Sequence, residues 1–264
     1  MSYFVTGGTG FIGQNLIKLL LKRRGTIHVL VRPGSVERLE QLKERWGRAA
    51  KRVVPVVGDL TRPYLGIAPA DRKALKGEIN HVFHLAAVYD LKADAAVQEA
   101  ANIKGTTNAI RFAEAVEAGR FHHVSSIAAA GMYPGTFTED MFDEAVGLDN
   151  PYFRTKHDSE GLVRHKCRIP WRIYRPGIVV GDSETGEIDK IDGAYYFFKS
   201  LQKIRRVLPP WFPLIGIEGG KFNIVPVDYV VDAMDHIVHL DDLDGRCFHL
   251  TNPDHHTMGN MMNI

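Results

Sequence analysis

The chain has 264 residues, of which 45% are hydrophobic and 24% charged, with a formal net charge of +2. This composition suffices for a sizeable core, and the interleaved charges exclude the dense basic surface of a nucleic-acid-binding protein. Two cysteines exclude a disulfide framework, and the scattered histidines lack zinc-ligand companions, so no metal site is expected. No secretory signal or membrane-spanning apolar run is recognisable, which predicts a soluble, cytoplasmic protein and leaves room for a peripheral membrane contact.

The predicted elements alternate between short apolar runs and longer helical patterns. We expect strands at residues 3–5, 26–31, 52–57, 81–85, 121–125 and 171–174, and helices at residues 11–24, 36–46, 93–118 and 151–166. Asn150 suits the N-cap of the last helix, and Pro151 suits its first position. The alternation predicts an α/β fold, a Rossmann-type doubly wound parallel sheet with helices on both faces.

A glycine-rich turn follows the first strand directly. Gly7, Gly10 and Gly13 have the spacing of a dinucleotide-binding turn. The first glycine permits the tight turn, the second lets a pyrophosphate approach the backbone, and the third lets helix and strand pack closely. Free amides and the helix dipole then face the phosphates. We therefore predict cofactor contacts from Gly7, Thr9, Gly10, Phe11, Ile12 and Gly13.

The residue that ends the second strand indicates which dinucleotide binds. An NAD site places an acidic residue there, whereas this chain has Arg32. A guanidinium suits a ribose 2′-phosphate, and Arg38 on the next helix is a second candidate, so we predict NADPH. Further contacts are predicted after the third, fourth and sixth strands, from Asp59, Leu60, Ala86, Ala87, Pro176 and Gly177. The alternatives are an ordinary turn after the third and sixth strands and simple helix–sheet packing after the fourth.

Tyr152 and Lys156 lie four residues apart in the predicted helix 151–166 and share one face. An ammonium beside a phenol lowers its pKa from about 10 and makes it a usable general acid. Lys156 can also reach the nicotinamide ribose. Ser125 and Ser126 end the fifth strand, where a hydroxyl can stabilise charge on a substrate oxygen. We predict Ser126, Tyr152 and Lys156 as the catalytic group, with Ser126 preferred to Ser125 because it lies further into the crevice.

In combination these motifs resemble an extended short-chain dehydrogenase/reductase. The resemblance also uses residues 85–87, 175–177 and 223–228, together with Asn102, which faces either a neighbouring backbone or solvent. Within this group the chain looks most like the reductase domain of bacterial NADPH-dependent fatty acyl-CoA reductases. That likeness rests on residues 84–90, 124–131, 183–187 and 195–198. It implies the roles given above for the catalytic group and a fatty acyl-CoA substrate, although members of the family continue well past the end of this chain.

The sequence therefore predicts NADPH-dependent reduction of a fatty acyl-CoA to an aldehyde, an alcohol or both. We expect an NADP-binding Rossmann core at residues 1–181 and a small, incomplete substrate-binding lobe at residues 182–264. That lobe is interleaved with final core elements, a helix at 228–240 and a strand at 247–250.

Several features of this interpretation stay open. We expect the aromatic stretch 195–214 either to line an acyl channel or to pack in the core. Residues 258–264 resemble the beginning of a helix that is not completed. We therefore expect a truncated chain whose partners include further domains of its parent. One alternative is an extended short-chain dehydrogenase/reductase that acts on another carbonyl or sugar-nucleotide substrate, as an epimerase, a dehydratase, or a hydroxysteroid or flavonol reductase. The other is a non-catalytic dinucleotide-sensing module.

Overall fold

A computed structural model describes the chain outside residues 88–93, 189–220, 255 and 258–264. Its centre is a seven-stranded sheet in the order β10-β6-β5-β4-β1-β2-β3, in which every neighbouring pair is parallel. These strands are β1 (Tyr3–Thr6), β2 (Ile27–Val31), β3 (Val53–Val57), β4 (His81–His84), β5 (Arg120–Val124), β6 (Trp171–Pro176) and β10 (Arg246–Leu250). The predicted Rossmann-type fold is confirmed.

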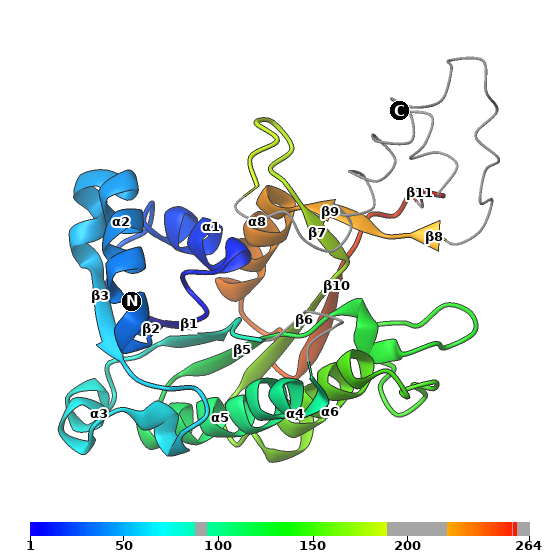
Figure 1. The fold of residues 1–264 in the computed structure, drawn as a ribbon, viewed down its shortest axis with the longest axis horizontal. Helices are drawn as coiled ribbons and strands as arrows, with labels where there is room; N and C mark the ends of the chain where they lie inside the picture. Colours follow the sequence, from blue (N-terminus) through cyan, green and yellow to red (C-terminus); the bar gives the residue numbers. More distant parts are fainter. Residues whose placement is uncertain (88–93, 189–220, 255, 258–264) are drawn as a thin grey trace.

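Helices cover both faces of the sheet (Figure 1). One face carries α1 (Phe11–Leu20), α2 (Val36–Trp46) and α8 (Val227–Val238). The other carries α3 (Pro69–Leu75), α4 (Ala95–Gln98), α5 (Gly105–Ala115) and α6 (Pro151–Lys166). Successive side chains of a strand point to opposite faces, so Tyr3 and Val5 join the core under α1 and α8 while Phe4 joins the core under α5. The central strands β1, β4 and β5 are therefore buried on both sides, as their continuous apolar runs predict, whereas Val54 and Val57 of the edge strand β3 are exposed.

Shorter elements connect these layers. The 3₁₀-helices are η1 (Pro33–Ser35), η2 (Gly47–Arg52), η3 (Pro63–Gly66) and η5 (Ile127–Ala130), and η4 (Glu99–Lys104) is a π-helix. β7 (Ile178–Val180) pairs in parallel with β9 (Ile224–Pro226), and β8 (Lys221–Phe222) pairs antiparallel with β11 (His256–Thr257). Within the described part of the chain, no helix is both long and apolar enough to cross a membrane.

Several predicted boundaries differ from the observed ones. The helix expected at 11–24 ends at Leu20, and the one expected at 93–118 is α4, the π-helix η4 and α5 in succession. The short helix α3 was not predicted. The expected helix 151–166 matches α6, with the Asn150 side chain accepting a hydrogen bond from the Tyr152 N–H at 2.8 Å. The predictions for 195–214 and 258–264 lie outside the described residues.

Candidate active site

The glycine-rich turn lies where the strand order reverses, with β1 next to β4. Gly7 has a φ of +73°, and a Cβ there would lie 2.7 Å from the Ala86 nitrogen, so the turns after β1 and β4 touch. A Cβ on Gly13 would overlap the Gly7 carbonyl oxygen. Gly10 is exposed, and no side chain caps the first turn of α1. Free amides at this point fit a pyrophosphate. The other predicted contacts here are partly buried: Thr9, Phe11, Ile12 and Ala87.

The ends of β2 and β3 carry the predicted adenine and 2′-phosphate contacts. The N–H and hydroxyl of Thr61 donate to Asp59 Oδ1 at 2.9 and 2.7 Å and lower the pKa of this carboxyl. Arg32 is exposed directly after β2. Its positive charge also lowers the pKa of Asp59, though less than Thr61 does, so the guanidinium lies near this carboxyl. Asp59 thus builds a turn, and its proposed adenine contact stays a prediction. Arg38 is exposed on α2, and Leu60 packs against the core under α5.

The structure brings the predicted catalytic hydroxyls together. Ser126 follows β5, and its hydroxyl lies near enough to the Tyr152 phenol at the start of α6 to lower the pKa of that phenol. The Ser126 Oγ also accepts the Ala128 N–H at 3.2 Å, which begins η5. One turn further along α6, Lys156 is only 4% exposed, and its Nζ donates to the Val124 carbonyl oxygen at 3.3 Å. All of these groups lie at the carboxyl end of β5.

Burial controls the ionisation of the candidate acid. It raises the pKa of Tyr152, and the nearby Ser126 hydroxyl lowers that pKa in part. The expected acidification of Tyr152 by Lys156 is not found in this structure: the pKa of the phenol is raised, only burial and Ser126 influence it, and the Lys156 Nζ donates to the Val124 carbonyl oxygen. Burial also lowers the pKa of Lys156 to about 8, against an opposing effect of the Glu160 carboxylate.

A buried ion cluster beside this group was missed by the sequence analysis. The Ser125 hydroxyl donates to Glu160 Oε2 at 2.7 Å, and Arg175 donates to both Glu160 oxygens at 2.6 and 3.0 Å. Arg164 donates to Glu160 Oε1 at 2.9 Å. The spacing of Glu160, four residues after Lys156 and four before Arg164, was the available signal. The cluster occupies the Ser125 hydroxyl, whereas the Ser126 hydroxyl is the one near Tyr152.

The remaining predicted residues lie around the same strand ends. Pro176 ends β6, and the N–H of Gly177 donates to the Leu250 carbonyl oxygen at 3.1 Å, so this amide already has a partner. Asn102 lies in η4 and is only 2% exposed. Its Nδ2 donates to the Thr155 hydroxyl at 3.1 Å, which excludes the solvent-facing alternative.

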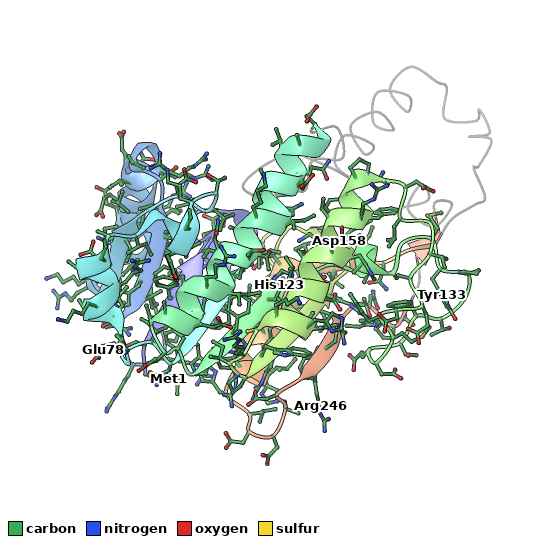
Figure 2. The ribbon with its side chains drawn as sticks, turned by 90° about the horizontal axis from the view of Figure 1, so that it is seen from below. Met1, Glu78, His123, Tyr133, Asp158 and Arg246 are labelled. Atoms are coloured by element: carbon green, nitrogen blue, oxygen red, sulfur yellow. The ribbon has the colours of Figure 1, made fainter. Side chains whose placement is uncertain are left out.

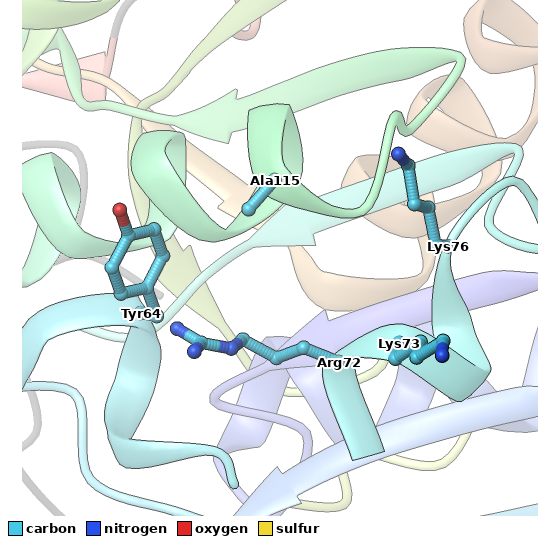
Figure 3. Close-up of a pocket in the computed structure, with 5 residues that line it drawn as sticks. All are labelled: Tyr64, Arg72, Lys73, Lys76 and Ala115. Atoms are coloured by element: carbon cyan, nitrogen blue, oxygen red, sulfur yellow. The ribbon is translucent and has the colours of Figure 1, made fainter. Parts of the chain in front are cut away.

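A basic cavity of about 310 Å³ lies apart from these residues, between η3, α3 and α5 (Figure 3). The guanidinium of Arg72 stacks over the Tyr64 ring at 4.2 Å from its centroid. Lys73, Lys76 and Ala115 complete the lining. None of these side chains belongs to the predicted site. Among the described residues, no group of three or more His, Cys, Asp or Glu side chains is arranged to hold a metal ion.

The NAD-binding family described as male sterility protein matches residues 5–234. The chain belongs to this family. Its fold is that of an extended short-chain dehydrogenase/reductase, so it is an NAD(P)-binding domain.

Known proteins of several kinds are similar to this member of the male sterility family. A component of the linear gramicidin synthase of Brevibacillus parabrevis is 31% identical over 95% of this chain, which spans 5% of that protein. The terminal R domain of the myxalamid polyketide–peptide synthetase pathway aligns with 99% of this chain and 68% of its own, at 26% identity and a TM-score of 0.85. A Drosophila melanogaster protein that carries a fatty acyl-CoA reductase name is 27% identical over 88% of this chain and 53% of its own length. The expected likeness to acyl-CoA reductases is thus present but more distant than that to synthetase reductase domains.

Proposed function

We propose that this chain is the reductase core of an enzyme that uses NADPH to reduce an acyl thioester to an aldehyde. The observation that carries the proposal is that the hydroxyls of Ser126 and Tyr152 lie near each other at the end of β5, with the buried amine of Lys156 one helical turn further along α6. The pair lies at the carboxyl end of β5, one strand away from the switch point at which the glycine-rich turn fits a pyrophosphate. Arg32 after β2 supports NADPH over NADH.

The chemistry follows from the positions of these groups. When bound, NADPH supplies the hydride that reduces the thioester carbonyl carbon. Ser126 and Tyr152 donate hydrogen bonds to the carbonyl oxygen as it gains negative charge, and Tyr152 gives it a proton. The resulting hemithioacetal loses its C–S bond, and the hydroxyl proton leaves with the thiolate, so the products are an aldehyde and a free thiol. As an ammonium, Lys156 stabilises the phenolate left on Tyr152. A second hydride and proton would convert the aldehyde into an alcohol.

The proposed substrate is a fatty acyl-CoA, as the sequence analysis predicts. The likeness to a gramicidin synthase component and to a synthetase R domain supports a thioester as the reacting group. This likeness also broadens the range of proposed substrates to acyl chains that a larger synthetase carries. We further propose that the partners of this chain include other domains of a longer parent protein. Parallel assays with a long-chain acyl-CoA and a short-chain acyl-CoA distinguish a lipid substrate from a smaller acyl group.

The first prediction tests the proton donor. In the protein that contains this chain, Tyr152→Phe should lower turnover of an acyl-CoA by about 10²- to 10⁴-fold, because the substitution removes the proton and keeps the ring. Turnover is measured as the loss of NADPH absorbance, and NADPH affinity by fluorescence titration should stay nearly unchanged. Tyr229→Phe, on the exposed side of α8, is the matched control and should keep full activity. Unchanged turnover in the Tyr152 variant would refute the assignment.

A further inference from the structure

The end of β4 holds a buried histidine that the proposed reaction does not use. His84 is only 1% exposed and is bonded through both ring nitrogens. Its Nδ1 lies 2.8 Å from the Thr6 hydroxyl oxygen and its Nε2 lies 2.9 Å from that of Thr106. Thr6 ends β1 immediately before Gly7, and Thr106 lies in the first turn of α5. His84 thus joins the cofactor turn to the helix layer on the other side of the sheet.

The hydrogen bonds around His84 fix its tautomer. The Thr106 hydroxyl donates its proton to the Asn102 carbonyl oxygen at 2.6 Å, so it can only accept from His84, and Nε2 must carry a hydrogen. The Thr6 oxygen accepts the Ala86 N–H at 3.3 Å and is free to donate to Nδ1. A neutral ring with a hydrogen on Nε2 satisfies every group. Burial supports this state, since burial, together with a smaller effect of the Lys156 charge, lowers the pKa of His84 to about 3.

The bonds continue from Asn102 to the catalytic helix. The Asn102 side-chain amide donates to the Thr155 hydroxyl, which donates in turn to the Tyr152 carbonyl oxygen at 3.2 Å. Thr155 lies between Tyr152 and Lys156 in the sequence. Asn102 belongs to the π-helix η4, where the backbone departs from regular α-helical bonding.

We propose that His84, held as the neutral Nε2–H tautomer, is a positioning residue that couples the glycine-rich cofactor turn to Tyr152 and Lys156 through Thr106 and Asn102. The inference rests on the proposed function, because it concerns the same site. It adds a residue that touches neither substrate nor cofactor. Small displacements of reacting groups cost rate far more than binding, so the effect belongs mainly to turnover.

A neighbouring histidine provides an internal control. His123 on β5 stacks on His84 with ring centroids 5.5 Å apart and an interplanar angle of 21°. It is equally buried, and neither of its ring nitrogens has a hydrogen-bond partner among the residues that the structure describes. Figure 2 shows His123 beneath the layer in which α5 and α6 run side by side. Replacing the histidine with phenylalanine therefore removes side-chain hydrogen bonds at His84 but not at His123.

The test compares these variants in the full-length protein. His84→Phe should lower kcat by about 10- to 100-fold with a smaller change in NADPH affinity, whereas His123→Phe should keep kcat within about two-fold. Thr106→Val should reproduce the loss, and adding it to His84→Phe should cause little further loss. His84→Gln, which can accept from Thr6 and donate to Thr106, should restore part of kcat. Equal losses at His84 and His123, or additive losses for His84 and Thr106, would overturn the proposal.

A second measurement is independent of activity. Nitrogen-15 NMR of histidine-labelled protein should show His84 with a hydrogen on Nε2 alone, and hydrogen exchange at the start of α6 should be faster in His84→Phe but not in His123→Phe. A hydrogen on Nδ1, or unchanged exchange, would overturn the coupling. If the wild-type protein binds NADPH yet reduces no thioester, the proposed function fails while these two measurements still decide the role of His84.

Discussion

At the scale of single residues, burial has a larger influence than charge pairing on the groups of the candidate site. Lys156 has lost most of its contact with water, which disfavours its ammonium form, and the nearby Glu160 restores only part of this. The phenol of Tyr152 is shifted the other way, toward its protonated form. A protonated tyrosine is the form that a proton donor needs, while the amine must stay charged to stabilise the phenolate that remains.

We therefore expect Lys156 to set an upper pH limit for activity. Its pKa of about 8 predicts that kcat/KM falls as the pH rises through this value, because the amine then loses its positive charge. The measurement is a pH profile of thioester reduction at low substrate concentration. In Lys156→Arg the charge persists at all these pH values, so any residual activity should lack this alkaline decline. An alkaline decline at the same pH in both proteins would contradict the assignment.

The predicted preference for NADPH over NADH depends on Arg32. Arg32→Ala should weaken NADPH binding by about 10- to 100-fold and leave NADH binding nearly unchanged, because a charge-assisted bond to the 2′-phosphate is lost. Arg38→Ala tests the second predicted contact in the same way. Arg48→Ala, exposed in η2, is the control for a general loss of positive charge. Equal losses for both nucleotides in Arg32→Ala would show that Arg32 does not recognise the phosphate.

At the scale of elements, the sequence predicts best where local patterns determine the structure. Residues 151–166 form the expected helix because Asn150, Pro151 and the side-chain spacing agree. The helix expected at 93–118 contains a π-helix and the buried Asn102–Thr155 hydrogen bond, neither of which the periodicity reveals. The cluster of Glu160, Arg175 and Ser125 also escapes prediction, since it joins α6, β6 and the end of β5 and requires the tertiary fold.

The glycine-rich turn gives an element-scale prediction. Gly13→Ala should abolish measurable NADPH binding, because its Cβ would overlap the Gly7 carbonyl oxygen and force α1 away from the turn. The measurement is a fluorescence titration with NADPH, accompanied by circular dichroism to confirm folding. Gly34→Ala is the control, since a Cβ there meets nothing within 4 Å and its φ is not positive. Normal binding by a folded Gly13 variant would show that the turn tolerates the extra carbon.

At the scale of the whole molecule, the sheet is polar where the sequence analysis expected only apolar strands. Four histidines on β4 and β5 are buried, namely His81, His84, His122 and His123. The scattered spacing of histidines argued against a metal site but did not show that two adjacent strands would place these side chains together. Parallel pairing aligns His84 with His123, an arrangement that follows from the strand order and register. The sequence could predict the order from the fold class, but not the register.

These buried histidines predict the acid sensitivity of the fold. Burial lowers the pKa of His81 and His84 to about 3 and that of His122 and His123 well below the usual value, so the folded state stays neutral where the unfolded chain binds protons. Stability is fully present above a pH of about 6.5 and is lost as the pH falls toward 3. For His81 and His84 the loss at a pH of about 5 is about 2 kcal/mol each. The free energy of unfolding in urea, measured above a pH of about 6.5 and again at a pH of about 5, checks the size of this loss.

A matched pair of variants identifies the source of that loss. His123→Phe removes a buried imidazole that has no hydrogen-bond partner in the described structure, so the free energy of unfolding should fall less steeply with decreasing pH than in the wild type. It should also be unchanged or higher at neutral pH, because no buried bond is broken. His236→Asn, on the exposed face of α8, should leave the slope of the wild type unaltered. Identical slopes for His123→Phe and the wild type would mean that the buried ring takes up its proton in the folded protein, and the loss of stability in acid would then belong to other groups.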